Sequence, residues 1–166
     1  MSKIIIALPR GRIINEIKKI LAKTSFAPEK EMFNDKSRKL TFSSKRKDVD
    51  FIKVRAFDAC TFVAFGAAQI GIAGEDVIKE FNYSEVYAPL ELNIGHCRLS
   101  VAALKTLLKK EDPETWSNIR VATKYPNISK EHFANKGHKV IGTSRNNFIF
   151  NSDNSNLIPL SLDITN

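Results

Sequence analysis

The chain begins with a strand-like apolar run that changes to helical spacing within a few residues. Residues 3–8 read Lys-Ile-Ile-Ile-Ala-Leu, and after residue 12 isoleucines and a leucine recur three and four positions apart. The break between the two, residues 9–12, reads Pro-Arg-Gly-Arg. A buried strand followed at once by an amphipathic helix forms a βα unit. This start predicts an α/β fold with a largely parallel sheet.

The break itself offers the first candidate binding residues. Gly11 lets a ligand approach the backbone closely. Arg10 and Arg12 provide forked guanidinium donors, and the free amides that begin the next helix point the same way. These features predict an anion site, although basic residues after a strand also suit an ordinary solvated turn. The local sequence leaves both readings open.

The charge of the chain indicates anionic partners. Its 166 residues, enough to bury a sizeable core, include 26 Lys and Arg against 18 Asp and Glu, a formal net charge of +8. Nucleotides, phosphate-rich metabolites, nucleic acid and acidic protein surfaces all fit that charge. No aromatic residue interleaves with the basic clusters at 45–47 and 109–110, so a stacking platform for single strands is not supported. We expect small phosphate-bearing ligands as partners, rather than nucleic acid.

Cysteine and histidine usage points to no metal site. Cys60 and Cys97 are too few for a disulfide framework; the sequence allows one disulfide between them, but we expect two free thiols. The three histidines are not spaced to complete a zinc site. The N-terminal apolar run is too short for a signal peptide, and no apolar stretch is long enough to span a bilayer. We expect a cytoplasmic protein with no membrane partner.

Strand-like and helix-like segments alternate after the first unit. A strand is predicted at 51–54, then a helix over 59–65 with Asp58 as its N-cap and Gly66 as its end. A short buried strand at 69–73 leads through Gly74 into a helix begun by two acidic residues. These elements form a first α/β lobe, residues 1–93.

A second, partial α/β lobe is predicted over 94–142. Strands are expected at 96–102, 118–123 and 139–141. A helix capped by Ser129 and ended by Gly137 separates the last two strands. Residues 143–166 are rich in Asn and Ser, lack helical periodicity, and form an atypical C-terminal tail.

Three strand-to-helix junctions, at 9–12, 73–76 and 123–127, carry features that bind phosphate. In an open α/β sheet such junctions gather at the carboxyl ends of the strands, where ligands bind. Arg38 and Arg55 would add guanidinium groups there. Each feature also has a structural explanation: Arg55 could pair with Asp58, Asp76 could simply favour its helix N-terminus, and Lys124 could be a turn lysine.

Six segments in order resemble one enzyme family, the catalytic subunit of ATP phosphoribosyltransferase in its short form. The segments read Ala-Leu-Pro-Arg-Gly-Arg at 7–12, Ser-Arg-Lys-Leu at 37–40, Val-Arg-Ala-Phe-Asp at 54–58, Gly-Ala-Ala-Gln-Ile-Gly-Ile-Ala-Gly-Glu-Asp-Val at 66–77, Gly-His-Cys-Arg-Leu at 95–99 and Val-Ala-Thr-Lys-Tyr-Pro-Asn at 121–127. The resemblance covers residues 3–141. Each motif alone is weak, but six in the right order are specific.

The resemblance implies a two-lobed fold of the type II periplasmic-binding-protein kind, with the active site between the lobes. It implies a glycosyl transfer that joins N1 of ATP to C1 of phosphoribosyl pyrophosphate and releases pyrophosphate, the first step of histidine biosynthesis. Mg²⁺ would be held mainly by substrate phosphates. The implied partner is a regulatory subunit resembling histidyl-tRNA synthetase, in a homo- or hetero-oligomer.

The resemblance also assigns roles to residues. Arg38 and Arg55 would be catalytic residues on the phosphate chains, with Arg55 near the leaving pyrophosphate. Gly11 and Arg12 would line the nucleotide cleft, Gly74 and Asp76 would form its floor, and Lys124 and Tyr125 would reach in from the second lobe. Arg10 and Glu75 are also assigned to substrate binding.

Two departures from the family pattern qualify these expectations. Arg10 stands where the family usually has lysine, which keeps the charge but changes its geometry. After about residue 142 the sequence lacks the Thr-Gly-x-Thr-Leu turn that holds the ribose 5-phosphate in the family. We therefore expect weakened binding of phosphoribosyl pyrophosphate. The alternative function is a remnant that binds nucleotide or a partner subunit without turnover.

Overall fold

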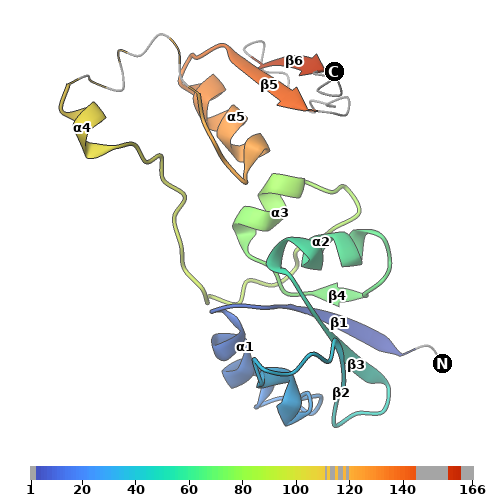
Figure 1. Ribbon diagram of the computed structural model, residues 1–166. Helices are drawn as coiled ribbons and strands as arrows, with labels where there is room; N and C mark the ends of the chain where they lie inside the picture. The colour runs from blue at the N-terminus through green and yellow to red at the C-terminus, as the bar shows by residue number, and fades with distance from the viewer. Residues whose placement is uncertain are drawn as a thin grey trace. The chain divides into compact units, whose positions relative to one another are not determined.

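The computed structural model describes residues 3–110, 112, 115, 118, 120–144 and 157–161 (Figure 1). The chain divides into two compact units, residues 1–97 and 98–166. The first unit includes residues 94–97 in addition to the predicted first lobe. Most of the predicted tail lies outside the described residues, including residues 148–150, where the run Phe-Ile-Phe predicts one short strand.

The first unit is built on a four-stranded open sheet. Its strands are β1 (Ile4–Pro9), β2 (Thr41–Ser43), β3 (Val49–Val54) and β4 (Ile70–Gly71). The strand order is β2-β3-β1-β4. β1 is parallel to both β3 and β4, whereas the short β2 runs antiparallel to β3. The predicted α/β class with a mostly parallel sheet is confirmed for this unit.

One face of the sheet packs against α1 (Ile14–Leu21) and the 3₁₀ helix η1 (Lys30–Phe33). The apolar spacing predicted from the sequence produces this contact, because α1 buries positions 14, 17 and 21. The core on this face comprises Ile6, Leu8, Ile17, Leu21, Met32, Phe42, Val49 and Phe51.

The other face packs against α2 (Ala56–Ala64), and α3 (Glu75–Phe81) contacts α2 in turn. The predicted N-cap of α2 is wrong. Arg55 is the N-cap, and Asp58 lies inside the first turn, because α2 begins directly after β3 without an intervening loop. Gly66, with φ +73°, follows the C-cap residue Phe65, which confirms the predicted stop.

β4 is shorter and more exposed than predicted. Only residues 70 and 71 are strand, and Ile70 is 50% exposed because β4 is the edge strand of the described sheet. Gln69 extends the pairing beyond β4. Its backbone N–H donates to the Ile5 carbonyl (3.0 Å), and its side-chain Oε1 accepts from the Ile5 N–H (2.8 Å).

The second unit contains α4 (Lys105–Leu108), α5 (Pro126–Asn135) and the parallel pair β5 (Val140–Ser144) and β6 (Leu157–Ser161). The predicted final strand is confirmed as β5, and Gly137, with φ +85°, follows α5 as predicted. Ser129 lies inside α5, whose N-cap is Tyr125, so that predicted cap is wrong.

Two predicted strands of this region, 96–102 and 118–123, are irregular at the positions that the structure describes. Alternating apolar residues predicted them, but a strand also needs a neighbour to accept and donate its backbone hydrogen bonds. Within the described ranges, no helix is both long and apolar enough to cross a membrane.

Candidate functional site

Two arginines follow the carboxyl ends of the central parallel strands. Pro9 of β1 lies opposite Val54 of β3, so Arg10 and Arg55 leave the sheet side by side. The Arg10 N–H donates to the Val54 carbonyl at 2.8 Å, which extends the pairing by one step. Neighbouring strands are about 4.8 Å apart, so the two side chains start close together.

Gly11 and Arg12 turn the chain from β1 into α1. Gly11 has φ +110°, and a Cβ built on it would meet no atom within 4 Å. Glycine is therefore needed there for its backbone conformation and not for lack of space. The Ile14 N–H donates to the Gly11 carbonyl (3.2 Å), which begins the helical turn. Arg12 is exposed at this turn.

Arg38 reaches the same edge from the other direction. β2 is antiparallel to β3, so the beginning of β2 lies beside the end of β3. The Lys53 N–H donates to the Leu40 carbonyl at 2.8 Å, and Arg38 precedes Leu40 by two residues. We call the carboxyl edge of this sheet, with Arg10, Arg12, Arg38 and Arg55, the arginine edge.

Polar contacts fix the loop that carries Arg38. The Lys39 ammonium contacts the Glu29 carboxylate at 2.6 Å, and the Ser37 hydroxyl donates to Glu31 Oε1 at 2.8 Å. The hydrogen bond from Lys39, with a second from the Ser43 N–H, lowers the pKa of the Glu29 carboxyl. Both ends of the short segment around Arg38 are thus tied to the segment 29–31.

The four guanidinium groups of the arginine edge are available to a ligand. All four residues are exposed, and none of these side chains forms a hydrogen bond or ion pair with another described residue. The alternative in which Arg55 pairs with Asp58 is therefore wrong. These arginines flank three neighbouring strands, β2, β3 and β1, whose outer two backbones are about 10 Å apart. Such a row suits a ligand with several phosphate groups.

The loop after β4 brings residues 74–76 to the same edge. The Ile72 N–H donates to the Ala7 carbonyl of β1 at 3.0 Å, which holds this segment beside β1. Gly74 is the N-cap of α3, and a Cβ there would collide with the Asp76 carboxylate. Glu75 forms an exposed ion pair with Lys79 (2.7 Å). Asp76 thus lies where it favours the start of α3, and a substrate-binding role remains a prediction.

Lys124 and Tyr125 belong to the second unit and precede α5. The Tyr125 N–H donates to Thr123 Oγ1 at 2.9 Å, and the Tyr125 carbonyl accepts from the Ser129 N–H at 3.0 Å. Lys124 is exposed and Tyr125 is half-buried. The structure therefore groups these two residues with α5, and their predicted role toward a substrate remains a prediction.

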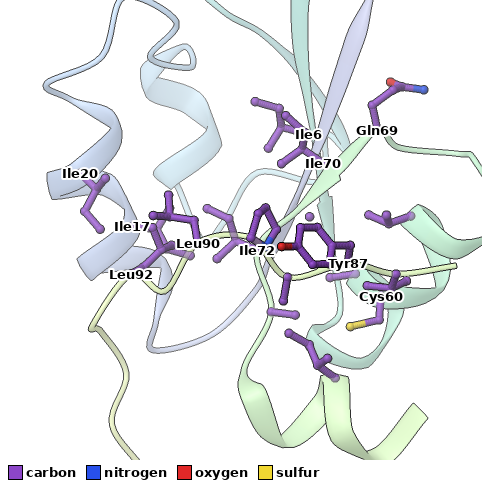
Figure 2. Close-up of a pocket in the computed structure, with 18 of the residues that line it drawn as sticks. Ile6, Ile17, Ile20, Cys60, Gln69, Ile70, Ile72, Tyr87, Leu90 and Leu92 are labelled. Atoms are coloured by element: carbon purple, nitrogen blue, oxygen red, sulfur yellow. The ribbon is translucent and has the colours of Figure 1, made fainter. Parts of the chain in front are cut away.

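An apolar pocket of about 480 Å³ lies beside β4 in the first unit (Figure 2). α1, β4 and the segment 86–92 contribute to its lining. Figure 2 shows Ile70, Ile72, Tyr87 and Leu90 around it. Its mostly apolar lining does not suit phosphate. No group of three or more His, Cys, Asp or Glu side chains in the described part of the chain could hold a metal ion.

Residues 55–144 match the protein family described as HisG: ATP phosphoribosyltransferase. The chain belongs to this family. The match spans both compact units and includes Arg55, residues 74–76 and residues 124–125.

Curated relatives named ATP phosphoribosyltransferase agree with this membership. The chain is 54% identical over 135 residues to the protein of Rhodospirillum rubrum, covering 81% of this chain and 60% of the relative. It is 52% identical over 136 residues to that of Rhizorhabdus wittichii, covering 82% and 62%. The chain therefore spans about 60% of the length of these relatives. A solved chain titled "ATP phosphoribosyl transferase (HisG:HisZ) complex from Thermotoga maritima" is 30% identical, with a TM-score of 0.40 over 49% of this chain and 36% of that chain.

Proposed function

We propose that this chain acts in the ATP phosphoribosyltransferase reaction, joining N1 of ATP to C1 of phosphoribosyl pyrophosphate with release of pyrophosphate. This reaction is the first step of histidine biosynthesis. The observation that supports it is the arginine edge, where four exposed guanidinium groups, with no ionic partner among the residues that the structure describes, lie at one end of a family member's sheet.

The arginine edge suits the charge changes of this reaction. Displacement at an anomeric carbon passes through an oxocarbenium-like state, and the leaving pyrophosphate gains negative charge. Guanidinium groups already in position stabilise that charge without reorganisation. We assign this role to Arg38 and Arg55, and we assign the ATP phosphates to Arg10 and Arg12, with Gly11 allowing close approach.

We propose that Mg²⁺ accompanies the substrates and is held by their phosphates. Mg²⁺ usually keeps several waters and is bound through substrate phosphates with few protein carboxylates, so this binding mode needs no dedicated protein cage. When bound, Mg²⁺ neutralises part of the phosphate charge. We further propose a type II periplasmic-binding-protein-like fold, a cytoplasmic location and assembly with a regulatory subunit resembling histidyl-tRNA synthetase. Family membership supports each of these proposals.

The test measures pyrophosphate release from ATP, phosphoribosyl pyrophosphate and Mg²⁺, with and without a regulatory subunit. Binding of ATP is measured in parallel by calorimetry. We expect ATP binding, and turnover above the uncatalysed rate when both substrates are present. Binding without turnover would support the alternative of a nucleotide-binding remnant. No binding of either substrate would refute both.

A matched pair of variants locates the site. Arg55→Gln removes one charge from the arginine edge, and Arg46→Gln removes the same charge near the start of β3, at the opposite edge, where Arg46 pairs with Asp48. We expect Arg55→Gln to weaken pyrophosphate binding about tenfold and Arg46→Gln to change it less than about twofold, since a charge-assisted contact contributes about 1.5 kcal/mol or more. Equal effects would show that only net charge matters.

A further inference from the structure

Lys53 is a buried charge beside the arginine edge. It lies on β3 in the same row as Val49 and Phe51, which face the core under α1 and η1. Only 6% of Lys53 is exposed, although lysine is almost never fully buried without a partner. A lysine at a core position of a central strand therefore requires an explanation.

The Lys53 ammonium binds the end of η1. Its Nζ donates to the Met32 carbonyl at 2.9 Å and lies 3.4 Å from the Asn34 carbonyl. Asn34 is the C-cap of η1, so the positive charge sits where the last carbonyls of the helical turn need donors. The Asn34 carbonyl also accepts from the Ser37 N–H at 3.2 Å, which begins the loop toward Arg38.

We infer that Lys53 is a positioning residue for Arg38, acting through the carbonyls that it holds at the start of the loop 34–40. This inference rests on the proposed function. The guanidinium of Arg38 has no partner among the described residues, so the backbone of its loop sets its place at the arginine edge. Lys53 holds the start of that loop, and the Glu29–Lys39 contact holds its end.

The physical advantage of this arrangement is preorganisation. A loop that is already ordered loses little conformational entropy when its arginine binds phosphate. Without the ammonium, the carbonyls at the end of η1 lose their buried donor, and the loop must be ordered by the ligand. Loss of the ammonium should therefore weaken the contact made by Arg38 and leave the other arginines unaffected.

The test is a double-mutant cycle on binding of inorganic pyrophosphate, measured by calorimetry with the full chain. Lys53→Met keeps an apolar stem without the charge, and Arg38→Gln removes the contact itself. We expect each to weaken binding about tenfold, and the double variant to bind no more weakly than Arg38→Gln. Additive losses would overturn the inference, because Lys53 would then act independently of Arg38.

Two further variants separate positioning from general stability. Lys53→Arg keeps a cation at the end of η1 and should restore most of the affinity. Ile52→Val perturbs the opposite face of β3, which packs against the core under α2, and should lower thermal stability while changing affinity less than about twofold. If Ile52→Val weakens binding as much as Lys53→Met, the effect of Lys53 is merely structural.

Hydrogen exchange gives a readout that does not depend on the ligand. Lys53→Met should speed amide exchange in 33–40 and leave α1 unchanged; Lys53→Gln provides a milder change should the methionine variant not fold. Unchanged exchange in 33–40 would overturn the inference. If the unmodified chain binds no pyrophosphate, the proposed function fails, whereas the exchange experiment still decides whether Lys53 orders the loop.

Discussion

Gly95 should tolerate a methyl group less well than other glycines with similar backbone angles. It has φ +64°, and a Cβ there would lie 2.8 Å from Ile13 Cδ1 and 3.2 Å from Ile13 Cγ1. Its N–H also donates to Glu16 Oε2 (3.3 Å), so the segment around residue 95 lies against the beginning of α1. Gly95→Ala would both strain the backbone and crowd Ile13.

The magnitude follows from three contributions. A left-handed conformation costs a non-glycine residue about 1–2 kcal/mol. Ile13 is partly buried and its terminal methyl can shift, so crowding adds only the cost of a displaced rotamer, about 0.5–1.5 kcal/mol. The lower conformational entropy of the unfolded alanine chain offsets about 0.4–1 kcal/mol. The net loss in the free energy of unfolding for Gly95→Ala should therefore be about 2 kcal/mol, measured by urea denaturation followed by far-UV circular dichroism.

Gly66→Ala is the matched control. Gly66 has φ +73°, but a Cβ there meets no atom within 4 Å, so only the backbone contribution applies. The expected loss is about 1 kcal/mol. Ile13→Val removes the Cδ1 methyl and should recover about 1 kcal/mol of the Gly95→Ala loss. Equal losses at positions 66 and 95, or no recovery with Ile13→Val, would refute the reasoning.

Three more predictions concern the core, the loop of Arg38 and the thiols. Phe42 is 1% exposed, so Phe42→Ala should lower the free energy of unfolding by about 3–5 kcal/mol; a loss below about 1 kcal/mol would contradict this. Lys39 lowers the pKa of the Glu29 carboxyl below its usual 4.5. The Glu29–Lys39 contact therefore stabilises the fold fully above pH 4.5, and this stabilisation is lost as the pH falls through the lowered pKa of Glu29. An NMR titration should show that Lys39→Met returns the Glu29 pKa toward 4.5, and no change would count against the contact. Burial raises the pKa of the Cys60 thiol, whereas Cys97 is exposed. A thiol reagent at pH 8 should therefore modify Cys97 quickly and Cys60 only after unfolding. Cys97→Ser should abolish the fast phase of the reaction.

The sequence was most informative where local pattern and tertiary structure agree. The apolar run and helical spacing around residues 4–21 predict β1 and α1, because both elements bury the faces that the pattern marks. Glycine at 66 and 137 marks helix ends, since a positive φ is a local requirement. The strands predicted at 96–102 and 118–123 were wrong because alternation does not reveal whether a pairing partner exists.

The arginine edge was partly predictable. Arg10, Arg12 and Arg55 follow predicted strands, and parallel strands bring their carboxyl ends to one edge. Arg38 required its resemblance to a family motif, because the antiparallel pairing of β2 that brings it there depends on long-range contacts. Lys53 was missed, since a lysine in a strand is ordinarily exposed. The alternation of Val49, Phe51 and Lys53 was the available signal.

The first unit is formed by one continuous stretch of the sequence, and this has a consequence for folding during protein synthesis. Within the described residues, the strands of its sheet and the four arginines of the arginine edge lie before residue 72, and the unit ends at residue 97. Compact units of a nascent chain generally fold as they leave the ribosome, the N-terminal one first. The arginine edge is thus assembled while residues of the second unit are still being translated.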